Sequence, residues 1–274
     1  MVGPLRGIID VLHDGTASVP QNLYKYGHIE DDKRILYTRK TLEDNDLYLA
    51  SPHGLSDPFD SAMKCIAKGS KAACKLLFRQ WLQRRPDLKR RKHLDFEKQF
   101  FRKSRWREEL VKGLEEEIMA KRREFGVFCM TRKKDDILMW AHYAANHKGF
   151  CLEFQTDNIF FARAREVRYG RRLAQVNLLS PWDSLIEHAA AALLTKSEDW
   201  RYEEEWRIVD LDSGVGVQKC PPEAISSVIL GCRMSSGKRE QIRDWCTSRK
   251  PKPMFYEARI KDGEFGLDLI PLAY

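Results

Sequence analysis

The chain has 274 residues, a formal net charge of +8 and 43% hydrophobic residues. This length and composition are typical of one large globular domain, or of one domain with an insertion. No apolar run approaches the roughly 20 residues that a membrane-spanning helix needs, and no export signal is visible, so we expect a cytoplasmic protein without membrane contact. Its seven cysteines are odd in number and lack CxxC spacing, which favours free thiols over a disulfide framework or a zinc ribbon.

The residue patterns predict an N-terminal arm over residues 1–21 and a single domain over residues 22–274. The expected elements are, in chain order, strands at 23–26 and 46–52, a basic helical block over about 61–124, a strand at 126–131, a helix at 135–149, strands at 150–154 and 166–170, a helix at 180–197, strands at 202–211 and 225–231, a helix at 235–246 and a strand at 253–260. Because these strands do not alternate regularly with helices, we expect an α+β fold with a mixed or antiparallel sheet.

Positive charge is concentrated in the basic helical block. Residues 64–124 contain 20 Lys and Arg against 9 Asp and Glu, an excess larger than the net charge of the whole chain. Such a segment attracts nucleic acid or an acidic protein. The candidate contact residues are Arg84, Arg85, Arg90, Arg91, Lys92, Arg102, Lys103 and Arg105.

Two motif classes do not fit the sequence. The stretch "GCRMSSGKR" has five residues between Gly231 and Gly237 instead of the four of a phosphate-binding loop, and Arg239 replaces the required Ser or Thr. His142 and His147 are five residues apart with no glutamate between them, unlike a helical zinc motif. We therefore expect no metal site.

The predicted helix at 135–149 places Trp140, Tyr143 and His147 on one face. One interpretation is a core helix with amphipathic side chains at its rim. The other is an aromatic wall beside a pocket, with His142 or Tyr143 donating a hydrogen bond to a ligand. The turn "HGLSDPFD" before the basic block leaves a similar choice, because Asp57 and Asp60 either shape the turn or line a pocket.

The stretch "WRYEEEWRI" (200–208) contains three consecutive glutamates. In a strand, Glu203, Glu205 and Arg207 share one face, and Glu204 lies on the other. Repulsion between two carboxylates about 7 Å apart raises one pKa unless a cation such as Arg207 intervenes. The pair is either a solvated strand face or a device that stabilises positive charge on a sugar during cleavage of an N-glycosidic bond.

Several segments together resemble a known group of proteins. The segments "LYKY", "SDPFD", "VFCMT", "LMWAHYAANHKGFCLEF", "KSEDWRYEEEWRI" and "ISSVILGCRMS" occur in this order over about residues 22–260. They resemble a widespread bacterial family known only as a domain of unknown function. The order of parts is also distantly similar to ADP-ribosyltransferase-like domains. Those domains have a split sheet with a basic or histidine position on an early strand, a small hydroxyl residue on a middle strand, and a glutamate on a later strand, often in a Glu-x-Glu pair.

The resemblance implies a set of site residues. The basic position is Lys25 or His28, the hydroxyl is Thr131, and the carboxylates are Glu203 and Glu205. The sequence departs from the pattern in having Lys where Arg or His is usual, and in lacking a Ser-Thr-Ser run on the middle strand.

The implied substrate is NAD. Glu205 would stabilise the oxocarbenium-like ribose with help from Glu203. The nucleotide contacts implied or inferred are Lys25, Tyr26, Thr131, Trp140, His142, Tyr143 and Arg207.

Two hypotheses follow. The first is an NAD-using ADP-ribosyltransferase or NAD glycohydrolase, a toxin or antiphage effector that acts on a protein or nucleic-acid target. The second is a non-enzymatic nucleic-acid-binding or partner module that uses the basic block and its interleaved aromatic residues, although their helical spacing equally suits core packing.

Overall fold

The computed structural model describes residues 18–83, 93–180, 188 and 190–273. Most of the predicted N-terminal arm lies outside these ranges. The candidate contact residues Arg84, Arg85, Arg90, Arg91 and Lys92 lie outside them as well.

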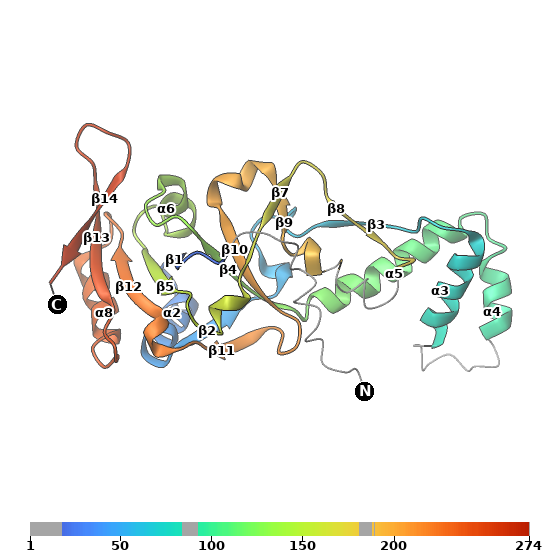
Figure 1. The fold of residues 1–274 in the computed structure, drawn as a ribbon, viewed down its shortest axis with the longest axis horizontal. Coiled ribbons are helices and arrows are strands. Elements are labelled where there is room, and N and C mark those ends of the chain that lie inside the picture. Colours follow the sequence, from blue (N-terminus) through green and yellow to red (C-terminus); the bar gives the residue numbers. More distant parts are fainter. Residues whose placement is uncertain (1–17, 84–92, 181–187, 189, 274) are drawn as a thin grey trace.

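An eight-stranded mixed sheet forms one half of an elongated molecule (Figure 1). In spatial order its strands are β14 (Leu267–Leu272), β13 (Met254–Ile260), β12 (Ile225–Leu230), β5 (Phe150–Gln155), β1 (Asn22–Gly27), β4 (Gly126–Thr131), β10 (Glu205–Asp210) and β6 (Arg165–Glu166). Strands β12 and β13 are parallel, and the other neighbouring pairs are antiparallel. The predicted α+β class with a mixed sheet is confirmed.

The pairing between β1 and β4 is short. Strand β1 pairs with β5 along its whole length, but it meets β4 at one residue pair, Tyr24 opposite Thr131. Lys25 reaches toward β4 just beyond that pair, where its Nζ donates a hydrogen bond to the Cys129 carbonyl at 2.8 Å. The Lys25 side chain therefore donates to a β4 carbonyl at a position where regular strand pairing would use a backbone N–H of β1.

Helices cover both faces of the sheet. Helices α2 (Asp32–Asp44) and α8 (Ser236–Trp245) share a hydrophobic cluster with Phe150, Leu152 and Phe154 of β5. The intervening Cys151 belongs to a second cluster with α6 (Ile137–Tyr143). Successive strand residues point to opposite faces, so α6 lies on the face opposite to α2 and α8.

The basic block forms the other end of the molecule (Figure 1). It contains β3 (Met63–Ile66), α3 (Lys71–Gln83), α4 (His93–Phe100) and α5 (Trp106–Arg122). Strand β8 (Ala174–Asn177), from a later part of the chain, pairs with β3 in parallel. The separate hydrophobic core of the block centres on Phe78, whose ring lies 4.4 Å from that of Phe100 and 5.4 Å from that of Phe101. The helical prediction is wrong at the start of the block, where the chain forms β3 instead.

Shorter elements complete the fold. They are β2 (Asp46–Leu49) paired with β11 (Gly216–Lys219), β7 (Arg168–Gly170) paired with β9 (Thr195–Ser197), and the 3₁₀ turns η2 (Pro52–Gly54), η4 (Phe161–Arg163), η5 (Glu198–Glu203) and η6 (Pro222–Ala224). Within the described part of the chain, no helix is both long and apolar enough to span a membrane.

Three predicted elements differ from the structure. The helix expected over 135–149 is capped by Asp136 as predicted, but it ends at Tyr143 because residues 145–147 are left-handed, with φ of 47°, 55° and 66°. The strand expected over 166–170 divides into β6 and β7. The helix expected over 180–197 falls partly outside the described residues, and its last three residues form strand β9.

Candidate functional site

The glutamate run straddles a kink. Glu203 is the last residue of η5, Glu204 has a left-handed φ of 43°, and Glu205 begins β10, three residues later than the predicted strand start. Glu203 and Glu205 are 2% and 5% exposed, whereas the Glu204 carboxylate is at the surface, 3.3 Å from the Lys133 Nζ. The predicted grouping of Glu203 with Glu205 is therefore confirmed, but a kink produces it, and the solvated-face interpretation is wrong.

Lys196 of β9 joins the two carboxylates. Its Nζ lies 2.5 Å from Glu203 Oε2, 3.0 Å from Glu205 Oε2 and 3.6 Å from Asp60 Oδ2. No local pattern singles out this lysine, because its strand is only three residues long. Lys196 is buried, so it contributes a strongly localised positive charge between the carboxylates.

Arg207 is a buried cation that binds two of the carboxylates, those of Glu205 and Asp60. Its guanidinium is fully buried and binds Glu205 through two hydrogen bonds of 2.8 Å and Asp60 through hydrogen bonds of 2.8 and 2.7 Å. It also donates to the Ser61 hydroxyl and to the Leu193 carbonyl. Since these protein groups take up all its N–H donors, Arg207 positions the carboxylates and has no donor left for the nucleotide contact expected from the sequence.

The cluster carries unbalanced charge. Asp60, Glu203 and Glu205 provide three carboxylates, and Lys196 and Arg207 provide two cations. Burial opposes ionisation of Glu205, but Arg207 and then Lys196 outweigh it and lower its pKa to about 2. Burial dominates at Glu203 and raises its pKa despite Lys196 and a hydrogen bond from Tyr143. Neighbouring carboxyl groups with opposite pKa shifts are suited to different chemical roles.

Hydroxyl groups fix the geometry of the kink. Thr131 donates a 2.5 Å hydrogen bond to the Glu203 carbonyl, and Tyr143 donates a 2.6 Å hydrogen bond to Glu203 Oε1. The Glu205 amide donates to the Tyr169 hydroxyl at 2.8 Å. Thr131, chosen as a nucleotide contact, thus also orients the carboxylate run.

A cavity of about 320 Å³ opens in front of the carboxylates. Its lining residues are Tyr24, Lys25, Tyr26, His28, Arg34, Leu55, Ser56, Asp57, Asp60, Cys129, Met130, Thr131, Met139, His142, Tyr143, Lys196, Glu203 and Glu205. Most candidate residues from the sequence are therefore brought to one place. Trp140 is the exception on α6: it is fully buried, its ring packs edge-on against Tyr26, and its Nε1 donates to the Lys134 carbonyl. Its expected role in a pocket wall is replaced by core packing.

Basic side chains also line the cavity. Lys25 and His28 come from β1 and the residues after it, and Arg34 comes from α2. These residues also line a second cavity of about 540 Å³, so the two cavities adjoin beside the short pairing of β1 with β4. Burial lowers the pKa of Lys25. Asp57 lies at the rim, where its Oδ1 accepts from the Phe59 amide as a turn residue does.

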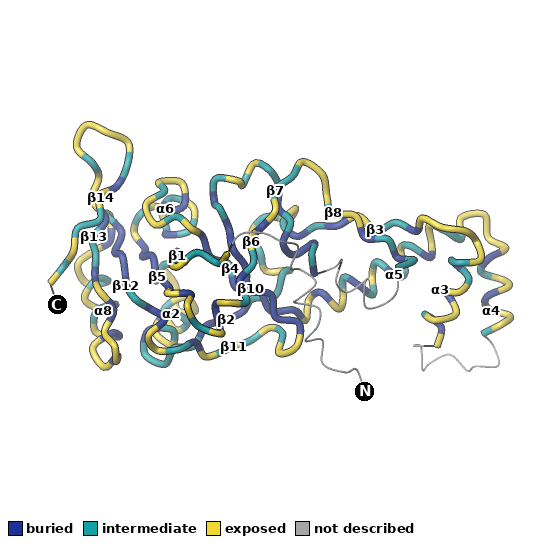
Figure 2. Tube along the Cα trace, in the orientation of Figure 1, coloured by how far each residue is buried: buried dark blue, intermediate teal, exposed yellow. Residues whose placement is uncertain are grey.

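The candidate contacts on the basic block lie away from this cavity. Arg102, Lys103 and Arg105 are exposed between α4 and α5 (Figure 2). Lys103 and Arg105 each pair with a nearby glutamate at 2.5 Å. Among the residues that the structure describes, no group of three or more His, Cys, Asp or Glu is placed to hold a metal ion.

Comparison with known proteins gives one finding. No curated protein matches the chain, and no solved structure matches it. The segment 139–208 contains most of α6, together with Lys196 and the glutamate run, and thus one side of the carboxylate cavity. Residues 139–208 match the sequence model of a family described as a protein of unknown function (DUF2971).

Proposed function

We propose that this protein cleaves the N-glycosidic bond of NAD and transfers the ADP-ribose group to an acceptor. The observation that carries the proposal is the buried cluster of three carboxylates and two cations, which faces a cavity that Lys25 and Arg34 also line. NAD has a matching distribution of charge, with a cationic nicotinamide ring and an anionic diphosphate.

The carboxylates suit the charge that develops in this reaction. As the glycosidic bond breaks, positive charge accumulates on the ribose, and a fixed anion in a dry site stabilises it. Glu205 is ionised over a wide pH range, since its pKa is about 2. Its two hydrogen bonds with Arg207 prevent it from turning away.

Glu203 suits the proton transfer. An acceptor O–H or N–H gives its proton to Glu203 as the acceptor atom bonds to C1′ of the ribose. The bond between C1′ and the ring nitrogen breaks, and its electron pair leaves with neutral nicotinamide. The raised pKa of Glu203 makes it a better base than an ordinary glutamate. Water as acceptor would give an NAD glycohydrolase.

The strand order also supports the proposal. Lys25, Thr131 and Glu205 lie on the adjacent strands β1, β4 and β10, and Thr131 pairs with Glu205 on one side and with Tyr24 on the other. This is the sequence of basic, hydroxyl and acidic positions that the resemblance to ADP-ribosyltransferase-like domains implies. A role as a toxin or antiphage effector rests on that resemblance.

Nucleic-acid binding by the basic block is the alternative. Its aromatic residues give it little support, because Phe78 stacks on Phe100 and both rings meet Phe101 edge-on inside the block. What remains in its favour is the exposed charge of residues such as Arg102 and Arg105. This alternative predicts salt-sensitive binding without NAD turnover.

The test is nicotinamide release from NAD by the wild type and three glutamate variants. Glu205→Gln is expected to lower the rate about a hundred- to thousandfold, as does loss of one charge-stabilising group in other enzymes. Glu204→Gln is the matched control, because it makes the same change one residue away at the surface, and it should leave the rate unchanged. Glu203→Gln should lower the rate and alter its pH dependence. No release by the wild type, with or without protein and nucleic-acid acceptors, would refute the proposal.

A further inference from the structure

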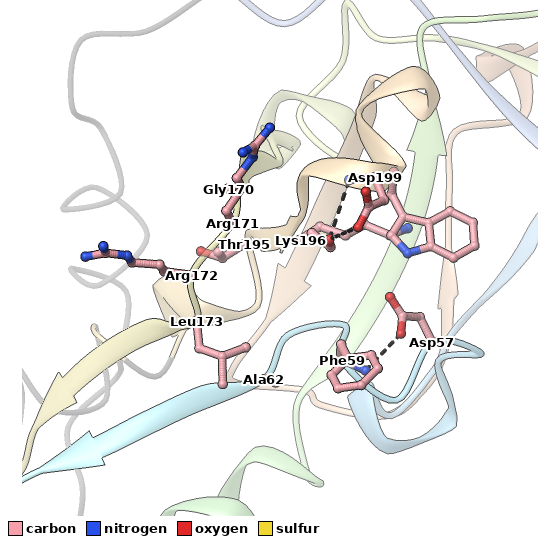
Figure 3. Close-up of a pocket in the computed structure, with 12 residues that line it drawn as sticks. Asp57, Phe59, Ala62, Gly170, Arg171, Arg172, Leu173, Thr195, Lys196 and Asp199 are labelled. Carbon is pink, nitrogen blue, oxygen red and sulfur yellow. Dashed lines mark hydrogen bonds between the residues drawn. The ribbon is translucent and has the colours of Figure 1, made fainter.

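A third cavity adjoins the carboxylate cavity on the side away from β1. Its volume is about 400 Å³, and it lies between β9, the turn after β7 and the turn that begins the basic block (Figure 3). Its lining residues are Asp57, Phe59, Ala62, Gly170, Arg171, Arg172, Leu173, Thr195, Lys196, Ser197, Asp199 and Trp200. Asp57 and Lys196 line both this third cavity and the carboxylate cavity. The third cavity therefore reaches the same lysine that bridges the two glutamates.

The rim of this cavity combines exposed arginine with exposed aromatic surface. Figure 3 shows Arg171 and Arg172 on one side and Phe59 on the other. Both arginines are exposed, and Phe59 is 68% exposed, although a large apolar ring at the surface gains nothing from folding there. Trp200 stands beside Lys196, whose Nζ lies 5.1 Å from the centre of its ring.

These groups match the two repeating parts of single-stranded nucleic acid. Aromatic rings stack on unpaired bases regardless of sequence, and arginine binds phosphate through its planar fork of N–H donors. A volume of about 400 Å³ is in the range of cavities that bind small ligands of nucleoside size. An acidic peptide would use the arginines but would leave Phe59 without a stacking partner.

We propose that this cavity binds single-stranded nucleic acid and presents it as the acceptor for the group transfer. The assignment of the bound strand as acceptor rests on the proposed function, whereas the binding itself does not. The base stacks on the exposed ring of Phe59, and the flanking phosphates lie on Arg171 and Arg172. The shared wall at Lys196 then brings the acceptor next to the carboxylates.

The experiment measures fluorescence anisotropy of short fluorescein-labelled single-stranded DNA and RNA at several salt concentrations, in parallel with nicotinamide release. The test variant is Arg171→Ala/Arg172→Ala. Its matched control is Arg102→Ala/Arg105→Ala, which removes the same charge from the basic block. A third variant, Phe59→Ala, changes the stacking surface without touching charge, and the exposure of Phe59 keeps the fold intact.

The expected result is specific to the cavity. Arg171→Ala/Arg172→Ala should raise Kd at least tenfold and reduce the salt slope by about 1.4, because each phosphate contact to a single strand contributes about 0.7. Phe59→Ala should raise Kd about tenfold with an unchanged salt slope. The control pair should bind as the wild type does, and nicotinamide release without acceptor should be unchanged in all three variants.

Three outcomes overturn the inference: no binding by the wild type, loss of binding in the control pair but not in the test pair, or equally tight binding of labelled polyglutamate through the same arginines. The last outcome would make the partner an acidic protein. The same experiment distinguishes failure of the proposed NAD chemistry from failure of the nucleic-acid binding site. If the wild type binds DNA or RNA through Arg171 and Arg172 but releases no nicotinamide, the binding site stands and the NAD chemistry fails.

Discussion

Removal of the Arg207 guanidinium is the most direct perturbation of the buried cluster. Arg207→Met keeps an unbranched side chain of similar length but leaves Glu205 and Asp60 without their shared cation. Breaking a buried ion pair by removing one partner typically costs about 3–5 kcal/mol.

The pKa of Glu205 gives a second figure, which is the net effect of burial, Arg207 and Lys196 on this carboxylate. Its pKa is lowered from an ordinary value of 4.5 to about 2, and each unit is worth 1.36 kcal/mol, which gives about 3 kcal/mol. Because the folded-state pKa is the lower one, this stability is present above about pH 4.5 and is lost as the pH falls toward about 2. The two figures agree in size, so we expect Arg207→Met to lower the free energy of unfolding by about 3–5 kcal/mol near neutral pH.

Urea unfolding at several pH values measures this effect. The difference in unfolding free energy between wild type and Arg207→Met should shrink as the pH falls from about 5 to about 3. Arg201→Met is the matched control, because the Arg201 side chain is 61% exposed and pairs with Glu198 at the surface, where such a pair contributes about 1 kcal/mol or less. A loss below about 1 kcal/mol in Arg207→Met, or a loss that does not vary with pH, would refute the reasoning.

Three further predictions concern stability. Because the pKa of Glu203 is raised in the folded protein, the wild type loses stability as the pH rises above the ordinary glutamate pKa of 4.5. A glutamine does not ionise, so Glu203→Gln should be less destabilising, relative to wild type, near pH 8 than near pH 4 in the same urea assay. Gly231→Ala should destabilise the protein because its Cβ would meet a backbone carbonyl oxygen at 2.3 Å, whereas Gly237→Ala in α8 meets nothing within 4 Å and should stabilise it by about 0.4–1 kcal/mol; thermal unfolding compares the pair. Phe78→Ala should cost about 3–5 kcal/mol within the basic block, and hydrogen exchange should show the loss of protection in α3–α5 but not in the eight-stranded sheet.

The sequence predicts the parts of the fold that depend on local pattern. Strands β1, β4, β5 and β12 are short apolar or alternating segments, and each is found within one or two residues of its expected place. Helix α2 was not expected, since Thr38 and Thr41 interrupt its apolar residues. The residues at its two ends are typical of helix ends: Asp31 is the N-cap, and Asn45 is a left-handed C-cap.

The candidate site could be predicted only in part. The pair Glu203 and Glu205 is visible as a local pattern, but the sequence leaves open whether it faces solvent or a pocket, and the structure buries both residues. Its partners come from elsewhere: Asp60 contacts Arg207 across 147 positions of the chain, and Lys196 comes from a strand that exists only through its pairing with β7. Such contacts depend on tertiary packing, which one sequence does not reveal.

The parallel pairing of β3 with β8 has a consequence for how related chains vary in length. Strand β3 leads into the helices of the basic block, whereas β8 belongs to the separate excursion between β7 and β9, more than 100 residues later. Val176 and Leu178 of that excursion share one hydrophobic core with the helices, so neither segment is covered without the other. We therefore expect the two excursions to be gained or lost together. Related chains that lack the helices should also have a short connection between β7 and β9.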